Sequence, residues 1–204
     1  QPGDEVWGDL SYPHGLGAFA EYVVVPEGVV FPIGDMPFEA GAMIEPLACV
    51  AWGIKRIEIQ PGDSALVFGA GPMGCLVSQA IRSAGATQVT VVDKISWRLE
   101  MARKLGATTA LNSSHESGNP LFDLGGYDIV VEATGINTVL EAAFNHVKPR
   151  GKVWVFGVIP PDKMASLNPY EVFRKDLSII GSFAVNQTFY EAIKMIQSGV
   201  VQVT

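Results

Sequence analysis

Residues 64–74 read Ser-Ala-Leu-Val-Phe-Gly-Ala-Gly-Pro-Met-Gly. The apolar run predicts a buried strand, and the glycines have the Gly-x-Gly-x-x-Gly spacing of a turn that leads into a helix. In such a turn Gly69 permits the tight bend, Gly71 lets a pyrophosphate approach the backbone, and Gly74 lets the helix pack close to the strand. The helix that opens at Pro72 presents free N–H groups and a partial positive charge to the phosphates. The stretch therefore predicts a dinucleotide site.

A carboxylate follows the next predicted strand. Residues 88–93 read Gln-Val-Thr-Val-Val-Asp, and Asp93 lies where a carboxylate can accept both ribose hydroxyls of a dinucleotide. A 2′-phosphate there would meet like charge, so Asp93 favours NAD over NADP. Lys94 and Arg98 weaken that exclusion, because either side chain could reach a 2′-phosphate. Two plainer interpretations stay open: the glycine turn binds no ligand, or Asp93 only caps the helix that begins near Ser96.

The composition is typical of a globular protein. The chain has 204 residues, is 48% hydrophobic and 17% charged, and carries a net charge of −7. These values fit one large domain, or one domain with part of another. The acidic balance without a basic cluster argues against nucleic acid and anionic membranes as partners. The apolar runs are strand-sized, and we expect neither a membrane span nor a signal peptide.

Two further expectations concern the cysteines and the chain ends. Cys49 and Cys75 both fall on apolar helical stretches, so free thiols in a reducing compartment, the cytoplasm, are expected in preference to a disulfide. The chain starts without Met and stops soon after a predicted helix. We therefore expect a fragment of a longer protein.

Strands and helices alternate from residue 64 onward. The strands are continuous apolar runs, as in strands that are buried on both faces. This alternation predicts an α/β fold, a doubly wound parallel six-stranded Rossmann sheet. The predicted strands are 65–69, 88–92, 108–111, 128–132, 152–157 and 177–181, and the predicted helices are 72–84, 96–105, 137–147 and 187–198, with a short helix near 169–174 and a loop at 113–126.

Before residue 64 the sequence pattern differs from this regular alternation of strands and helices. Short strands separated by Pro and Gly turns are predicted at Asp4–Gly8, Ala18–Pro26 and Val29–Ile33. An apolar stretch with helical spacing runs over Phe38–Ile57, and only Pro46 breaks it.

A series of motifs runs through the chain in a fixed order. They are Gly-Ala-Phe-Ala-Glu-Tyr-Val-Val-Val-Pro at 17–26, Ile-Glu-Pro-Leu-Ala at 44–48, Pro-Gly-Asp-Ser-Ala-Leu-Val-Phe-Gly-Ala-Gly-Pro-Met-Gly at 61–74, Arg-Leu-Glu-Met-Ala-Arg-Lys-Leu-Gly-Ala at 98–107, Glu-Ala-Thr-Gly at 132–135 and Ile-Gly-Ser-Phe at 180–183. This series resembles the medium-chain dehydrogenase/reductase superfamily, and most closely its zinc-dependent polyol (sorbitol) and threonine dehydrogenases. The resemblance implies that residues 1–36 are the last part of a chaperonin-10-like catalytic β-barrel domain, 37–59 a linking helix, and 60–204 the NAD-binding Rossmann domain.

The resemblance also implies roles at three strand ends. Residues 132–135 would lie beside the nicotinamide ribose, residues 156–158 would offer backbone groups to the carboxamide, and residues 182–184 would flank the nicotinamide. These positions agree with the carboxyl edge of an open sheet, where ligands bind, although each could also be an ordinary strand-to-helix turn. The expected cofactor site comprises Gly69, Gly71, Pro72, Met73, Gly74, Asp93, Lys94, Arg98, Ala133, Thr134, Gly135, Gly157, Val158, Ser182, Phe183 and Ala184.

Glu45 is the candidate for chemistry outside the cofactor site. It lies between apolar residues, and a carboxylate that is buried there needs a partner. By resemblance, it would be a ligand of a catalytic zinc, directly or through its water, in the full-length protein; the plainer alternative is an acid at a helix N-terminus. Glu45 alone cannot hold zinc, and the resembling family's upstream ligands are not in this chain. The segment between Gly8 and Ala18 has no Cys, so no structural zinc is expected.

Among the histidines, His146 is interpreted as a favourable charge or a cap at a helix C-terminus. The interpretation that we favour overall is the NAD-binding portion of an enzyme that oxidises a secondary alcohol or polyol, with zinc in the full-length protein. An NADPH-dependent quinone or enoyl reductase without zinc, and a non-catalytic nucleotide-binding module, are the alternatives. The resemblance implies a homo-oligomer, in which the strand around 176–182 would be an exposed edge that pairs between subunits.

Overall fold

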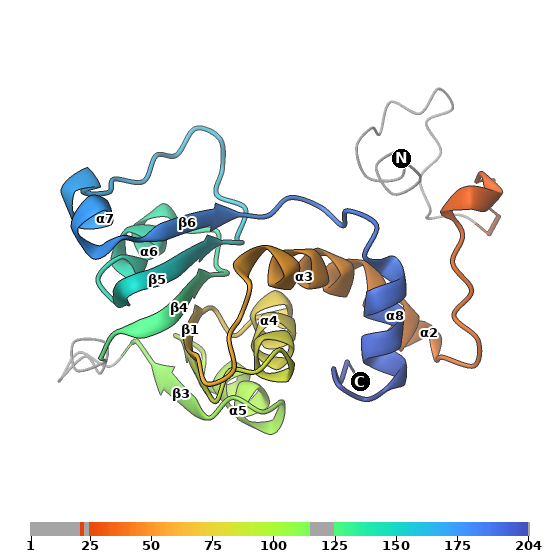
Figure 1. Cartoon of the computed structure of the whole chain (residues 1–204). Helices are drawn as coiled ribbons and strands as arrows, with labels where there is room; N and C mark the ends of the chain where they lie inside the picture. The colour runs from red at the N-terminus through yellow and green to blue at the C-terminus, as the bar shows by residue number, and fades with distance from the viewer. Residues whose placement is uncertain (1–20, 23–24, 115–124, 204) are drawn as a thin grey trace.

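The computed structural model describes residues 21–22, 25–114 and 125–203. The strands predicted at Asp4–Gly8 and over most of Ala18–Pro26 lie outside the described residues. The described part contains a sheet with helices on both faces (Figure 1).

The sheet is parallel throughout, with the order β3-β2-β1-β4-β5-β6. The predicted doubly wound Rossmann sheet is therefore confirmed. Strand order reverses between β1 and β4, and in such sheets the crevice at the reversal is where ligands bind. The strands are β1 (Ser64–Phe68), β2 (Gln88–Asp93), β3 (Thr109–Asn112), β4 (Tyr127–Glu132), β5 (Val147–Val155) and β6 (Ser178–Gly181).

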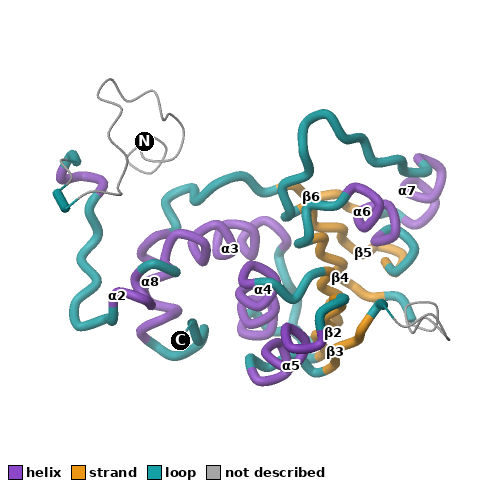
Figure 2. The backbone as a smooth tube through the Cα atoms, turned by 180° about the vertical axis from the view of Figure 1, so that it is seen from behind, coloured by secondary structure: helices purple, strands orange, loops and turns teal. Residues whose placement is uncertain are grey.

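Alternate strand residues enter two separate cores. Val67 and Val131 face a core that is shared with α3, α4, α5 and α8, whereas Leu66 and Val130 face a smaller core with α6. Figure 2 shows the sheet between these two helical layers. The helices are α2 (Phe38–Gly41), α3 (Ile44–Ile57), α4 (Pro72–Ser83), α5 (Ser96–Lys104), α6 (Asn137–Ala143), α7 (Pro169–Lys175) and α8 (Phe189–Gln197).

The stretch Phe38–Ile57 breaks at a different place from the one predicted. Two helices, α2 and α3, meet at Ala42 and Met43, and Pro46 lies in the first turn of α3. Proline is tolerated there because its missing N–H would have no partner within the helix. The predicted strand Val29–Ile33 is also wrong: Glu27–Val29 is a short 3₁₀ helix, and the residues after it pair with no described strand.

The boundary between α6 and β5 is the largest shift from prediction. β5 starts at Val147, where the sequence predicts a helix end, and its register against β4 slips between Tyr127 and Ile129. The slip accommodates Arg150 at φ +63° and lets the Tyr127 N–H donate to the carbonyl of His146, 2.8 Å away. His146 therefore lies in a turn rather than at a helix end. Its burial lowers the pKa of the imidazole, which disfavours the charged form, whereas its backbone N–H donates to the carbonyl of Ala143, the last residue of α6, at 3.1 Å.

The last described residues are held against α4. The Gln79 side chain is buried, its Oε1 accepts from the Gln202 N–H at 2.8 Å, and its Nε2 donates to the Gln202 carbonyl at 3.1 Å. α8 itself packs on α3, where the buried Thr188 hydroxyl donates to the Ala48 carbonyl at 2.6 Å. In the described ranges no helix is long and apolar enough to cross a bilayer.

Candidate functional site

The glycine turn joins β1 to α4 with its backbone tightly packed. Gly69 has φ +104°, and a Cβ at Gly74 would lie 1.9 Å from the Gly69 carbonyl oxygen. Only glycine fits these two positions. Gly71 differs, because the nearest atom to its would-be Cβ is a guanidinium nitrogen of Arg98 at 4.0 Å. The open space over Gly71 is the approach that a phosphate needs.

The N-terminus of α4 has no side-chain cap. Gly71 occupies the N-cap position and Pro72 follows it, so neither supplies a side-chain acceptor for the first N–H groups of the helix. Uncapped N–H groups at a helix start attract anions. The turn and the helix start thus combine open space with free N–H groups, and residues 69–74 are called the phosphate cradle after the ligand that the sequence predicts for them.

Asp93 links this cradle to the end of β2. Its Oδ2 accepts from the Ala70 N–H at 2.8 Å, and its Oδ1 accepts from the Ile95 N–H at 2.9 Å. The side chain is only 11% exposed. A carboxylate oxygen has room for a second hydrogen bond, so each oxygen can still accept a ribose hydroxyl. Asp93 is not the cap of α5, because the N-cap residue of that helix is Ile95 and its start has no side-chain cap.

Arg98 lies between Asp93 and Gly71. One guanidinium nitrogen is 4.0 Å from Asp93 Oδ2, and the guanidinium lies over the Trp97 ring at 5.5 Å. Its Nε is buried, and no acceptor in the described part of the chain reaches it. Lys94 is solvent-exposed. Of the two predicted basic residues, Arg98 is therefore the one that the structure brings to the carboxylate.

Glu132 organises the turn after β4, a role that sequence reasoning missed although it placed residues 132–135 at the nicotinamide ribose. The side chain is fully buried, and its Oε1 accepts from the N–H and hydroxyl groups of Thr134 and, at 2.9 Å, from the Gly135 N–H. This one oxygen fixes the backbone of Ala133–Gly135. The available signal was an acid directly after the apolar run Ile-Val-Val, at the carboxyl end of the predicted strand.

The turns after β4 and β5 touch each other. Gly135 has φ +73°, and its would-be Cβ lies 2.7 Å from the Val158 carbonyl oxygen. At Gly157 a Cβ would lie 2.3 Å from the Gly135 nitrogen and 2.6 Å from Glu132 Oε2. The structure therefore brings the predicted residues of these two turns together at the carboxyl edge. The Val158 side chain is 90% exposed there.

Ser182, Phe183 and Ala184 follow β6 at the same edge. Gly181, the last residue of β6, pairs with Val155 of β5. Phe183 is 89% exposed. Ala184 has φ +57°, a backbone conformation that is strained for residues other than glycine. The three predicted turns thus adjoin one another along β4, β5 and β6.

Comparison with known proteins places the chain in a family. The family model described as "Zinc-binding dehydrogenase" matches residues 72–198, which is more than half of the chain. D-altritol 5-dehydrogenase of Agrobacterium fabrum is 37% identical over 89% of the chain and 54% of its own length. The chain belongs to the zinc-binding dehydrogenases of the medium-chain dehydrogenase/reductase superfamily.

Solved structures support the same assignment for this zinc-binding dehydrogenase chain. A zinc-binding dehydrogenase from Sinorhizobium meliloti 1021, bound to NADP, has a TM-score of 0.76 at 27% identity and covers 80% of the chain and 50% of its own. An alcohol dehydrogenase from Escherichia coli CFT073, complexed with NADH, has a TM-score of 0.84 at 26% identity, with coverages of 93% and 57%. The chain spans about half the length of the curated relatives that it matches.

Glu45 of this zinc-binding dehydrogenase chain lies on α3 and in none of the predicted cofactor turns. It is in the first turn of α3, half-buried, and its Oε1 accepts from the Cys49 thiol at 3.3 Å. Burial and the neighbouring Glu45 carboxylate raise the pKa of Cys49 to about 12. Across the described ranges no three His, Cys, Asp or Glu side chains converge on a point that would suit a metal.

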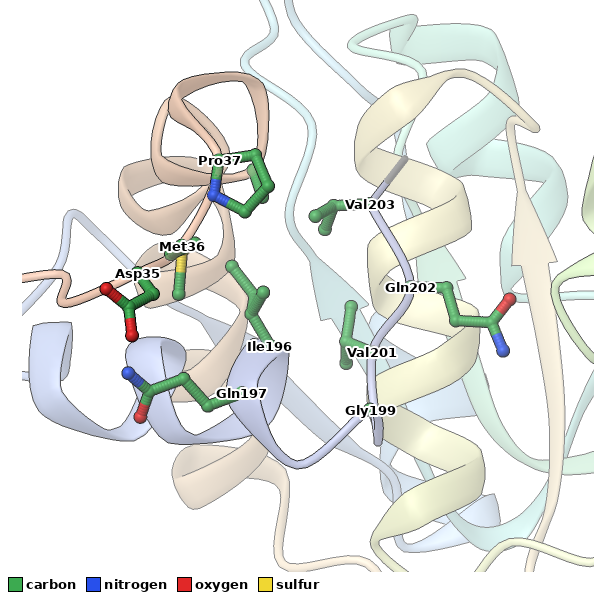
Figure 3. Close-up of a pocket in the computed structure, with 10 residues that line it drawn as sticks. Asp35, Met36, Pro37, Ile196, Gln197, Gly199, Val201, Gln202 and Val203 are labelled. Carbon is green, nitrogen blue, oxygen red and sulfur yellow. The ribbon is translucent and has the colours of Figure 1, made fainter.

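Two of the cavities beside the last described residues differ in their relation to the glycine turn. One, of about 480 Å³, runs from Gly71 along α4 and α5 and is lined by Trp97 and Arg98. The other, of about 560 Å³, lies between Met36 and Pro37 on one side and Ile196 and Val203 on the other (Figure 3). Only the first borders the phosphate cradle.

Proposed function

We propose that this chain is the NAD-binding portion of an alcohol or polyol dehydrogenase that oxidises a secondary alcohol by hydride transfer to NAD. The observation that carries the proposal is the hydrogen bond between Asp93 and Ala70, which joins a ribose-binding carboxylate to an open phosphate cradle at Gly71. The named relatives support the class of reaction, because D-altritol 5-dehydrogenase and D-arabinitol dehydrogenase 1 have names that specify polyol oxidation.

The proposed roles follow the carboxyl edge of the sheet. The uncapped start of α4, with Pro72 and Met73, would bind the pyrophosphate, and Asp93 with Arg98 would bind the adenosine ribose. The turns at Ala133–Gly135, Gly157–Val158 and Ser182–Ala184 would hold the nicotinamide end. Once bound, the nicotinamide supplies the hydride acceptor, and the protein orients it against the alcohol.

NAD is the proposed cofactor in preference to NADP. Both oxygens of Asp93 already hold backbone N–H groups, so the carboxylate cannot swing away from a 2′-phosphate without breaking two hydrogen bonds. Arg98 offsets part of this negative charge from 4.0 Å, and Lys94 is near enough in sequence to contribute. We therefore expect a preference for NAD rather than complete exclusion of NADP.

Zinc is assigned no step in this chain. The described residues contribute one candidate ligand, Glu45, and a neighbouring thiol whose raised pKa disfavours the thiolate that binds metal. We propose that Glu45 contributes to a catalytic zinc only in the full-length protein, where residues 1–36 would complete a catalytic domain and 37–59 would link it to the cofactor domain. Cytoplasmic location is proposed from the two free cysteines.

Self-association through β6 is proposed as the assembly. β6 forms one edge of the sheet, and large apolar side chains are exposed on β6 and on the adjoining α7 and loops: Val158, Met164, Tyr170, Phe173, Ile179 and Phe183. An unpaired edge with exposed apolar residues is a surface on which another copy can add strands.

Calorimetric titration of the 204-residue chain with NADH and NADPH tests the cofactor assignment. We expect weak NADH binding, weaker NADPH binding, and no turnover of any polyol by the chain alone. Asp93→Ala should reduce the preference for NADH, whereas Asp162→Ala, which removes an exposed carboxylate, should leave it unchanged. The proposal is wrong if neither cofactor binds at millimolar concentration, or if Asp93→Ala leaves the preference as it was.

A further inference from the structure

Trp154 is an unusually confined residue at the cofactor end of the sheet. It is fully buried near the end of β5, on the face that α3 covers. α3 presents Gly53 to it, and a Cβ at Gly53 would lie 1.8 Å from the ring carbon Cζ2. The Phe156 ring packs on the same indole at 4.9 Å. The ring therefore has one available position, and its N–H has one available direction.

That N–H donates to the hydroxyl oxygen of Ser182. The Nε1–Oγ distance is 2.9 Å, and the bond links residues that are 28 apart in sequence. An indole can only donate, so the Ser182 oxygen must be the acceptor and its own proton must point elsewhere. No acceptor in the described part of the chain receives that proton. The hydroxyl is thus oriented by Trp154 and retains an unused donor.

The segment that begins at Ser182 is held at both ends and strained between them. Ala184, Asn186 and Gln187 all have positive φ values, from +34° to +63°. The Trp154 bond fixes the start of the segment, and the buried Thr188, bonded to Ala48, fixes its end. Strain of this kind persists only where surrounding contacts impose the conformation. The anchoring bonds at Ser182 and Thr188 are contacts of that kind.

We propose that Trp154 is a positioning residue for the nicotinamide end of the cofactor, acting through Ser182. The indole aims the Ser182 hydroxyl so that its free proton is donated to a carbonyl acceptor, and the nicotinamide carboxamide is the acceptor of that class at this edge. The inference rests on the proposed NAD-binding function. Gly53 contributes to the same arrangement, because the absence of a side chain there provides the space in which the Trp154 indole lies.

The test compares two ligands, NADH and ADP-ribose, the second of which lacks the nicotinamide. Titrations use the 204-residue chain and its variants Ser182→Ala, Trp154→Phe, the double variant, and Ser182→Thr. Removal of one hydrogen bond should weaken NADH binding about fivefold in Ser182→Ala and in Trp154→Phe. Neither variant should change ADP-ribose binding. Ser182→Thr restores a hydroxyl and should restore NADH binding, and Trp52→Phe is the matched tryptophan control with no expected effect.

Comparison of the NADH affinities of the single and double variants distinguishes a positioning role of Trp154 from a merely structural one. The double variant should bind NADH no more weakly than Ser182→Ala, because Trp154 acts only through that hydroxyl. If the two losses add, or if Trp154→Phe leaves NADH binding intact, the inference is overturned. Equal weakening of NADH and ADP-ribose would also overturn it, since the effect would then be structural. If the unaltered chain binds neither ligand, the proposed function itself fails.

A second measurement covers the case in which Trp154→Phe does not fold. In the unaltered chain, the Trp154 indole N–H resonance should shift when NADH is added and stay in place when ADP-ribose is added. Ser182→Ala should abolish the NADH-dependent shift. A resonance that responds equally to both ligands contradicts the proposal.

Discussion

Gly71 and Gly74 have different tasks although they lie in the same turn. A Cβ at Gly74 would overlap the Gly69 carbonyl oxygen at 1.9 Å, whereas one at Gly71 would meet only Arg98 at 4.0 Å. The first glycine keeps a space open for ligand, and the second brings the helix against the strand. A substitution at each position separates binding from stability.

Gly71→Ala should therefore lower the free energy of unfolding by no more than about 1 kcal/mol while it weakens NADH binding at least about tenfold. Gly74→Ala should lower the free energy of unfolding by more than about 2 kcal/mol, because the turn must open to admit the methyl group. Urea denaturation and NADH titration check both values. A Gly71→Ala chain that binds NADH normally would contradict the assignment of the cradle.

Glu132 allows a second test at the level of one residue. Glu132→Gln keeps an oxygen that can accept from Thr134 and Gly135, so its stability should stay within about 1 kcal/mol of the unaltered chain. Glu132→Ala leaves those buried donors without a partner and should cost about 2–4 kcal/mol. Urea denaturation of both variants measures the difference, and equal stabilities would show that the carboxylate does not support the turn.

The sequence predicts those residues whose chemistry is local. Glycines at fixed spacing predict the phosphate position, and an acid at a strand end predicts the ribose position. Trp154 escaped prediction because its role depends on Ser182, a partner that folding brings close and that no spacing rule connects to it. The partners of Glu132 are near it in sequence, but the turn conformation that brings Thr134 and Gly135 onto one carboxylate oxygen is visible only in the structure. The hydrogen bonds of Asp93 to Ala70 and Ile95 likewise required the structure.

Three strands are tied together by polar contacts at the edge opposite the cofactor turns. Asp128 of β4 accepts from the Ser64 hydroxyl at 2.6 Å and from Lys148 of β5 at 2.9 Å. Partial burial alone would raise the pKa of Asp128, but the hydrogen bonds from Ser64 and Lys148 and the charge of Lys148 outweigh it. They lower the pKa from 3.8 to about 2.

Because the folded state prefers the ionised Asp128, this contribution to stability is complete above about pH 4 and is lost as the pH falls toward 2. Asp128→Asn should therefore lower the free energy of unfolding by about 1 kcal/mol at pH 7, allowing for partial solvent exposure. The difference in free energy of unfolding between the unaltered chain and Asp128→Asn should become smaller below pH 4. Urea denaturation at a series of pH values measures it, and a gap that does not depend on pH would contradict the assignment.

Helices and strands were predictable to the extent that periodicity determines them. The apolar runs place all six strands, and the glycine and proline signals place most of the helix ends. Two elements were displaced for reasons that lie beyond the local pattern. Pro46 is harmless in a first helical turn, and β5 extends back to Val147 because Tyr127 of β4 offers it a partner.

At the scale of the whole molecule, the exposed β6 edge predicts association. Ile179 lies on β6 and Phe173 on the adjoining α7, and they are 43% and 82% exposed. Ile179→Lys should shift the chain toward monomer in sedimentation velocity experiments, because a charge at a sheet edge opposes strand pairing. Lys194→Glu on α8 is a charge-changing control that should not affect assembly. If both variants sediment as the unaltered chain does, β6 is not the contact.

The two hydrogen bonds between Gln79 and the Gln202 backbone join points that are 123 residues apart in sequence. Closure of so long a stretch costs chain entropy, so this junction should be among the last contacts made during folding and among the first to open. The Gln202 amide proton should then exchange with deuterium well before the amides of β1 and β4. Its exchange rate would measure how often the segment after α8 detaches from α4 while the sheet remains folded.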